Sequence, residues 1–152
     1  MKKQLTILQL LNLAADEFYE EAKHMGRLAN HALSTKGRSQ MKGLERVANS
    51  LVKVSDIFDN VKKQTARHEE WQTDNFGQQL LTFLEQDLRT RTEDIVKQAQ
   101  EAIRESETDQ HPTEITALDK QEIYIRLCQE YVRQLVVHYE YALAEGGGNH
   151  AE

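Results

Sequence analysis

Apolar residues recur every three or four positions along most of the chain, which is the spacing of one face of an α-helix. The first such stripe begins at Leu8 in a predicted helix over residues 5–33, and alanines recur along it. A second predicted helix begins at Ser39, a residue type that caps helix N-termini, and its apolar stripe covers residues 44–61. These two segments already favour an α-helical protein.

Two more amphipathic segments follow, over residues 74–104 and 118–144. The polar run RTRTED predicts a break within the first of them, and residues 105–116, which contain the only proline, predict the one clear loop. The glycine run at 146–148 predicts a flexible C-terminal tail. We therefore expect an all-α fold, a bundle of four to five helices in a single domain over 1–145, followed by a tail over 146–152.

Composition narrows the class of protein. The single cysteine, Cys128, excludes an internal disulfide framework and a cysteine-rich zinc site. Glu21 and His24 match one Glu-x-x-His element of di-iron bundles, but the sequence has no second copy. No stretch reaches the roughly 18 apolar residues of a membrane span, and no signal-peptide core follows the Met-Lys-Lys start. We expect a soluble cytoplasmic protein with no membrane partner, no cofactor and no bound metal.

Charge is distributed unevenly along the chain. Between residues 36 and 67, eight Lys and Arg oppose three Asp and Glu, so this segment carries +5, whereas the whole chain carries −6 and the remainder −11. On a helical wheel at about 100° per residue, six cations fall opposite the apolar stripe of the second predicted helix: Arg38, Lys42, Arg46, Lys53, Lys63 and Arg67. Regularly spaced cations suit a phosphate backbone, and the solvated face of an ordinary amphipathic helix is the alternative interpretation.

The last predicted helix has apolar residues on two sides. Its core face contains Cys128 and nine neighbours on the wheel: Tyr124, Ile125, Tyr131, Val132, Leu135, Val136, Tyr139, Ala142 and Leu143. The second strip consists of Ile123, Leu127, Val137 and Tyr141. A helix that covers one core does not need this strip, so it indicates either deeper burial or contact with another subunit, self-association included. The pattern leaves both open.

One pair of residues matches a catalytic motif. Arg133 and His138 resemble the Arg-polar-x-x-x-His motif of HEPN ribonucleases, which are also small all-helical proteins with the motif near the C-terminus. That resemblance implies that the pair acts on the scissile phosphate and the 2′-hydroxyl across a dimer, with a cation and a group that titrates near neutrality. The other interpretation is that Arg133 is solvated and His138 borders the core.

Two stretches resemble a known family: STKGRSQMKGLERVANSLVKV and YIRLCQEYVRQLVVHYEYALAEGGG. Together they resemble the small helical subunit of type III (Csm-type) CRISPR effector complexes. That family enters an early helix through a Ser-Gln-hydrophobic-Arg/Lys pattern, which stands here as Ser39, Gln40, Met41 and Lys42. Its last helix is rich in aromatic and aliphatic residues and is followed by glycines. Residues 131–148 of this sequence show the same pattern.

This resemblance implies a non-enzymatic role in a ribonucleoprotein of antiviral defence. Such subunits flank the duplex of guide RNA and target RNA, contact its backbone, and stack against other subunits of the complex. Gln40 then joins the six cations as an expected RNA contact, and the second strip of the last helix becomes the expected subunit interface. A HEPN-type ribonuclease and a helical protein–protein adaptor are the two alternative functions.

Overall fold

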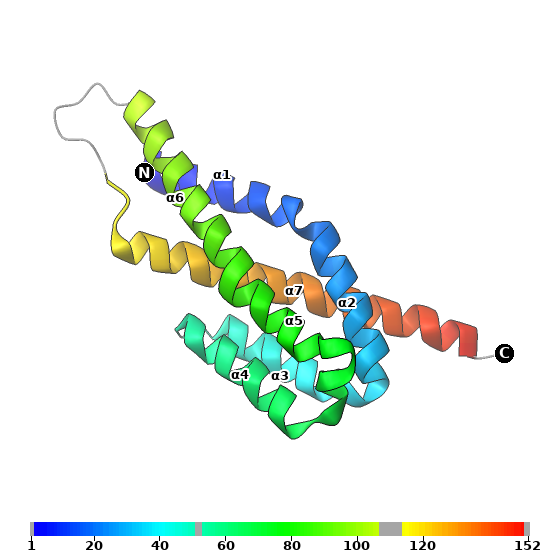
Figure 1. Cartoon of the computed structure of the whole chain (residues 1–152). Helices are drawn as coiled ribbons and strands as arrows, with labels where there is room; N and C mark the ends of the chain where they lie inside the picture. Colours follow the sequence, from blue (N-terminus) through cyan, green and yellow to red (C-terminus); the bar gives the residue numbers. More distant parts are fainter. Residues whose placement is uncertain (1, 51–52, 107–113, 151–152) are drawn as a thin grey trace.

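The computed structural model describes residues 2–50, 53–106 and 114–150, and every regular element within them is helical. In chain order the elements are α1 (Lys2–Glu17), α2 (Tyr19–Leu33), the 3-10 turn η1 (Ser34–Gly37), α3 (Arg38–Asn49), α4 (Val54–Arg67), the 3-10 segment η2 (Glu69–Asn75), α5 (Phe76–Thr82), the π-helical turn η3 (Phe83–Asp87), α6 (Leu88–Ser106) and α7 (Ala117–His150). Figure 1 shows them as a helical bundle. If α1–α2 and α5–α6 are each counted as one bent rod, the described residues form five rods, which confirms the predicted all-α bundle.

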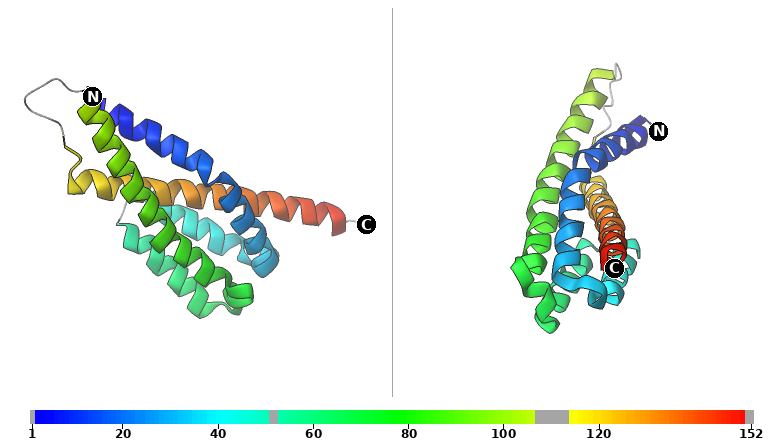
Figure 2. Two further views of the ribbon diagram at one scale, coloured as in Figure 1. Left: turned by 45° about the horizontal axis from the view of Figure 1, so that its top comes forward. Right: turned by 90° about the vertical axis from the view of Figure 1, so that its right-hand side faces the viewer.

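The bundle is organised around α7, against which α1, α2, α3 and α6 all pack (Figure 1). Tyr131 and Tyr139 of α7 are completely buried, and the Tyr139 hydroxyl donates a hydrogen bond to the carbonyl of Ser34 after α2. The C-terminal turns of α7 extend beyond α2 in both Figure 1 and Figure 2. Even α7 is not long and apolar enough to cross a membrane, nor is any other helix of the described residues.

The first predicted helix is bent at Phe18, which separates α1 from α2. Phe18 departs from helical geometry (φ −94°, ψ 8°), although the hydrogen bonds from its amide to Ala14 and from the Ala22 amide back to its carbonyl persist. Its ring is fully buried and meets Tyr131 edge to face at 5.5 Å. The buried face of α1 contains Ile7 and Leu11, whereas Leu8, the predicted start of the apolar stripe, is 46% exposed.

The second predicted helix is wrong as a single element, because the chain reverses after α3. Ser50 ends α3, where its hydroxyl donates to the carbonyl of Val47 at 2.7 Å, and Lys53 is extended (φ −63°, ψ 147°) before α4 begins. α3 and α4 then run side by side in opposite directions (Figure 1). The reversal lets both apolar faces reach the core, whereas one helix of 30 residues would be about 45 Å long. Ser39 lies inside α3 and makes no capping hydrogen bond.

The third predicted helix is irregular at a different place than expected. The RTRTED run lies inside the regular helix α6, and the irregularity is the π-helical turn η3, just before it. This turn adds a residue to the local helical repeat and allows Phe83, Leu84 and Leu88 all to be buried. Of the predicted loop over 105–116, residues 107–113 lie outside the described residues.

The start of α7 follows a local sequence signal, whereas its end does not. Thr116 and Asp119 form a reciprocal capping box: the Thr116 amide donates to the Asp119 carboxylate at 2.8 Å, and the Asp119 amide donates to the Thr116 hydroxyl at 3.1 Å. The helix was expected to end near residue 144, but it continues through Gly146 to His150. The first part of the predicted tail is therefore helical, and residues 151–152 lie outside the described residues.

Candidate nucleic-acid interface

The outer face of α3 presents three cations, Arg38, Lys42 and Arg46, each four residues from the next and each exposed. Successive members are therefore separated by a rise of about 6 Å along the helix axis. The opposite face is held in the core by buried apolar side chains, namely Met41, Leu44 and Ala48. The apolar pattern of α3 thus fixes the direction in which these cations point.

Two further predicted cations, Lys63 and Arg67, lie on the exposed surface of α4, whose buried face consists of Ile57, Phe58 and Val61. Lys53 precedes α4 and is 78% exposed. The prediction of one continuous stripe across all six cations is therefore wrong, because its wheel assumed a helix that continued through residues 50–53. The cations instead form two groups on the antiparallel helices α3 and α4, which we call the α3–α4 hairpin.

Ion pairs separate these cations into two classes. Arg38 pairs with Glu140 of α7 at 3.6 Å, and Lys53 pairs with Asp56 at 3.9 Å. Within the described part of the chain, four cations of the hairpin have no ion-pair partner: Lys42, Arg46, Lys63 and Arg67. We call these four the unpaired cations.

The acidic residue of α3 lies near a different helix. Glu130 first, and Glu45 in addition, raise the pKa of the Arg133 guanidinium on α7. Glu45 is therefore electrostatically engaged with α7. On α4, Asp56 is engaged with Lys53, whereas Asp59 is exposed among the cations. The hairpin surface consequently keeps a net positive charge.

Gln40, predicted as an RNA contact, has a structural partner instead. The indole nitrogen of Trp71 donates a hydrogen bond of 2.6 Å to the Gln40 side-chain oxygen. Trp71 lies in η2 and is completely buried, and its ring packs against Phe76 at 5.0 Å. This hydrogen bond joins α3 to η2, so Gln40 positions the hairpin from its inner side. Sequence reasoning did not find this role because the two residues are 31 positions apart.

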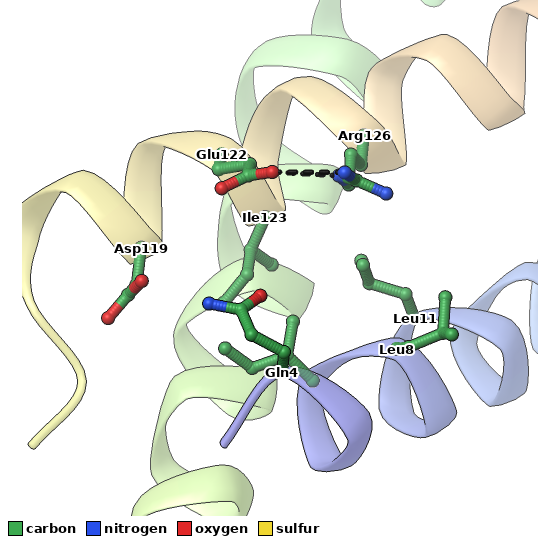
Figure 3. A pocket seen from close by; sticks show the side chains of 8 residues that line it. Gln4, Leu8, Leu11, Asp119, Glu122, Ile123 and Arg126 are labelled. Carbon is green, nitrogen blue, oxygen red and sulfur yellow. Dashed lines mark hydrogen bonds and ion pairs between the residues drawn. The ribbon is translucent and has the colours of Figure 1, made fainter. Parts of the chain in front are cut away.

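The second strip of α7 divides into a buried and an exposed half. Ile123 and Leu127 are each only 1% exposed, whereas Val137 is 50% and Tyr141 65% exposed. Figure 3 shows Ile123 pointing from α7 toward α1, where Leu8 lines the facing wall of a groove of about 190 Å³. Deeper burial therefore explains the first half of the strip. Only Val137 and Tyr141 remain accessible to a partner.

The alternative catalytic pair, Arg133 and His138, occupies two different environments. Arg133 is exposed and makes two hydrogen bonds to the Glu130 carboxylate, one of them 3.0 Å long from Nε. His138 is 9% exposed, its Nε2 is buried without a hydrogen-bond partner, and its ring meets Tyr19 edge to face at 4.8 Å. Burial lowers the pKa of His138, and the charges of Lys23 and Arg27 lower it further. At neutral pH the uncharged imidazole of His138 is therefore the favoured form.

The described residues contain no group of three or more His, Cys, Asp or Glu side chains able to hold a metal ion. Burial raises the pKa of Glu21, and nearby His24 acts in the opposite direction, but the two residues form no such group. Comparisons of the chain with protein-family models, curated proteins and solved structures give no match.

Proposed function

We propose that the α3–α4 hairpin binds the phosphate backbone of RNA. The observation that carries this proposal is the set of four unpaired cations, Lys42, Arg46, Lys63 and Arg67. An exposed cation that forms no ion pair gains more from a phosphate than a paired cation does, because no existing ion pair must be broken. Each phosphate that it neutralises also releases condensed counterions, and this release drives nonspecific binding to nucleic acid.

The side chains on the hairpin surface favour binding to the phosphate backbone of an RNA duplex. Unpaired bases are recognised by stacking on exposed aromatic side chains. Among the residues of α3 and α4 the one aromatic side chain is Phe58, and it belongs to the core at 8% exposure. Cations without a stacking platform match the phosphates of a double-stranded target, which such a surface reads by shape and not by sequence.

Because two stretches of the sequence resemble the small helical subunit of type III (Csm-type) CRISPR effector complexes, we propose that the chain is such a non-catalytic subunit. In this assignment the hairpin flanks the duplex of guide RNA and target RNA, and Lys42 belongs to both the family pattern and the unpaired cations. The exposed half of the second strip, Val137 and Tyr141, supplies a contact for a neighbouring subunit. A non-enzymatic role is consistent with the pairing of Arg133 to Glu130 and with the burial of His138.

The direct test measures the affinity of the purified protein for double-stranded RNA as a function of salt. The variants are Lys42→Glu with Arg46→Glu, and Lys63→Glu with Arg67→Glu. The matched control is Lys97→Glu with Arg104→Glu, which reverses two exposed cations on α6. We expect each double variant to lower the slope of log affinity against log salt by about 1.5 in magnitude, since each phosphate contact contributes about 0.7 to 0.9.

Two outcomes would contradict the proposal. Equal affinities for the wild type and both double variants would leave the hairpin as a solvated face and would favour the protein–protein adaptor. Cleavage of the RNA that disappears in Arg133→Ala or His138→Ala would favour the HEPN-type ribonuclease. Intact RNA in every sample, with weaker binding only in the hairpin variants, supports the non-catalytic subunit.

A further inference from the structure

A glycine, Gly43, stands in the middle of α3, at a position where the packing of the chain does not require one. Glycine destabilises a helix interior relative to alanine, because it loses more conformational freedom on folding. Gly43 is the sixth of the twelve residues of α3, so it caps neither end of the helix. A Cβ atom added at this position meets nothing within 4 Å. The missing side chain therefore makes room for no other group of the described residues.

Packing explains three other glycines of the described chain. A Cβ atom added to Gly26, Gly37 or Gly77 would lie 2.5, 2.5 and 2.0 Å, respectively, from the nearest side-chain atom of another residue. Each of these glycines therefore permits a close approach within the fold. Gly146, near the end of α7, has the same open surroundings as Gly43. Gly43 differs from Gly146 in its position, because it lies on the α3–α4 hairpin.

Gly43 lies between two of the unpaired cations. Lys42 precedes it directly and Arg46 follows three residues later, so along the helix axis Gly43 is about 1.5 Å from the first and about 4.5 Å from the second. Around the axis it lies about 60° from Arg46 and about 160° from Met41, whose side chain is completely buried. Gly43 is therefore on the outer side of α3, beside the cations.

The contacts of α3 with the core fix the backbone at this position. Met41 and Leu44, on either side of Gly43 in the sequence, are completely buried. The hydrogen bond from the Trp71 indole to the Gln40 side chain joins the same part of α3 to η2. Because these contacts hold the helix in place, its outer surface cannot move inward to make room for a ligand. The side chain at position 43 therefore determines how closely a ligand approaches the helix.

We propose that Gly43 is the point at which the sugar–phosphate backbone of RNA comes closest to α3. This inference rests on the proposed function, since it assigns a positioning role to one residue of the same hairpin surface. Glycine allows a ligand to approach a protein backbone closely, because it has no Cβ atom. A strand that lies against Gly43 is within reach of both Lys42 and Arg46. A larger side chain holds the strand away from these cations and weakens an attraction that falls with distance.

The test combines two measurements on the full-length protein, namely thermal unfolding and the affinity for double-stranded RNA. In Gly43→Ala we expect a higher midpoint of unfolding, because alanine favours the helix. We also expect the RNA affinity to fall about threefold in Gly43→Ala and about tenfold in Gly43→Leu, because added volume at a close contact is unfavourable. Neither substitution changes the charge of the hairpin. A variant that is more stable and yet binds RNA less tightly has lost contact with RNA and kept its fold.

Two matched controls make the same kinds of change outside the hairpin. Gly146→Ala adds a methyl group to α7 at a second glycine whose added Cβ atom meets nothing within 4 Å. Ala102→Leu enlarges an exposed side chain of α6. Both controls should bind double-stranded RNA with the affinity of the wild type, because neither residue lies beside the unpaired cations.

Three results would overturn this inference and leave the proposed function intact. The first is an unchanged RNA affinity in both Gly43 variants while the charge-reversal variants of the hairpin bind more weakly. The second is an equal loss of affinity in Gly43→Ala and Gly146→Ala, which would indicate an effect unrelated to the hairpin surface. The third is a lower midpoint of unfolding in Gly43→Ala, which would show that the fold itself requires the glycine. A wild type that does not bind RNA would instead overturn the proposed function and this inference together.

Discussion

Gly26 of α2 lies directly against His138 of α7, and no larger residue fits between the two helices at this point. A Cβ atom at position 26 would lie 2.5 Å from the Cβ of His138 and 2.9 Å from the amide nitrogen of Tyr139. Both of these atoms are rigidly placed, one next to the backbone and the other in it. The close approach of α2 and α7 therefore depends on a glycine and fixes the part of α7 from which Val137 and Tyr141 extend.

The Gly26→Ala variant should be destabilised by about 1 to 3 kcal/mol, because the added methyl forces α2 away from α7. Gly43→Ala is the matched control, since a Cβ at this position of α3 meets nothing within 4 Å. In the control we expect a gain of about 1 kcal/mol from helix propensity. Chemical denaturation measures both, and equal effects of the same sign would contradict the close packing at Gly26.

Replacing Gln40 should affect stability and not RNA binding. Gln40→Ala leaves the buried indole nitrogen of Trp71 without an acceptor, which costs about 1 to 3 kcal/mol. The fluorescence of Trp71, the only tryptophan, reports the unfolding transition and the polarity around the ring. Gln40→Glu keeps an acceptor and should retain more of the stability. A loss of RNA affinity in Gln40→Ala without a loss of stability would instead restore Gln40 as a direct RNA contact.

The two halves of the second strip of α7 should respond differently to truncation. Ile123→Ala and Leu127→Ala each remove a buried side chain, so each should cost about 2 to 5 kcal/mol. Val137→Ala and Tyr141→Ala change exposed side chains and should alter stability by less than about 0.5 kcal/mol. Denaturant titrations of the four variants check this division. A large loss of stability at Tyr141 would show that it packs within the chain.

His138 should make the fold sensitive to moderate acid. Burial, Lys23 and Arg27 lower its pKa, while Glu20 opposes them. The unfolded chain therefore binds a proton more readily, so the stability from His138 is fully present above its ordinary pKa of about 6.5 and is lost as the pH falls through the lowered value. The free energy of unfolding, measured from pH 7.5 to pH 5, should decline less steeply in His138→Gln than in the wild type. Parallel curves would rule out a contribution from His138.

The sequence predicted most of the fold where the signal was local. The three-to-four spacing of apolar residues identified the helical segments, and the faces it assigned to α3 put Lys42 and Arg46 on the outside, as the structure does. It did not predict the reversal between α3 and α4, because the segment over residues 50–53 has neither glycine nor proline and begins with Ser50, an ordinary polar residue. The continuous stripe of six cations was wrong for this reason alone.

The sites themselves depend on contacts between distant segments. Glu21 of α2 and Tyr131 of α7 interact between two helices that are far apart in the sequence, and no spacing pattern predicted that contact. Gln40 matched an expected RNA-binding pattern, yet its oxygen accepts a hydrogen bond from Trp71. The partner of a side chain depends on which helix packs beside it, and the spacing of residues in the sequence does not show which helix that is.

By itself the sequence determined that the chain is helical, which faces of α3 and α4 are apolar, and that positive charge is concentrated between residues 36 and 67. These properties follow from the helical repeat and from residue type, both of which are local. Only the tertiary structure decided where helices bend, why Ile123 is buried while Tyr141 is exposed, and which cations lack partners. The physical reason is that burial and ion pairing depend on the neighbours that packing brings together, as where α1, α2, α3 and α6 all pack against α7.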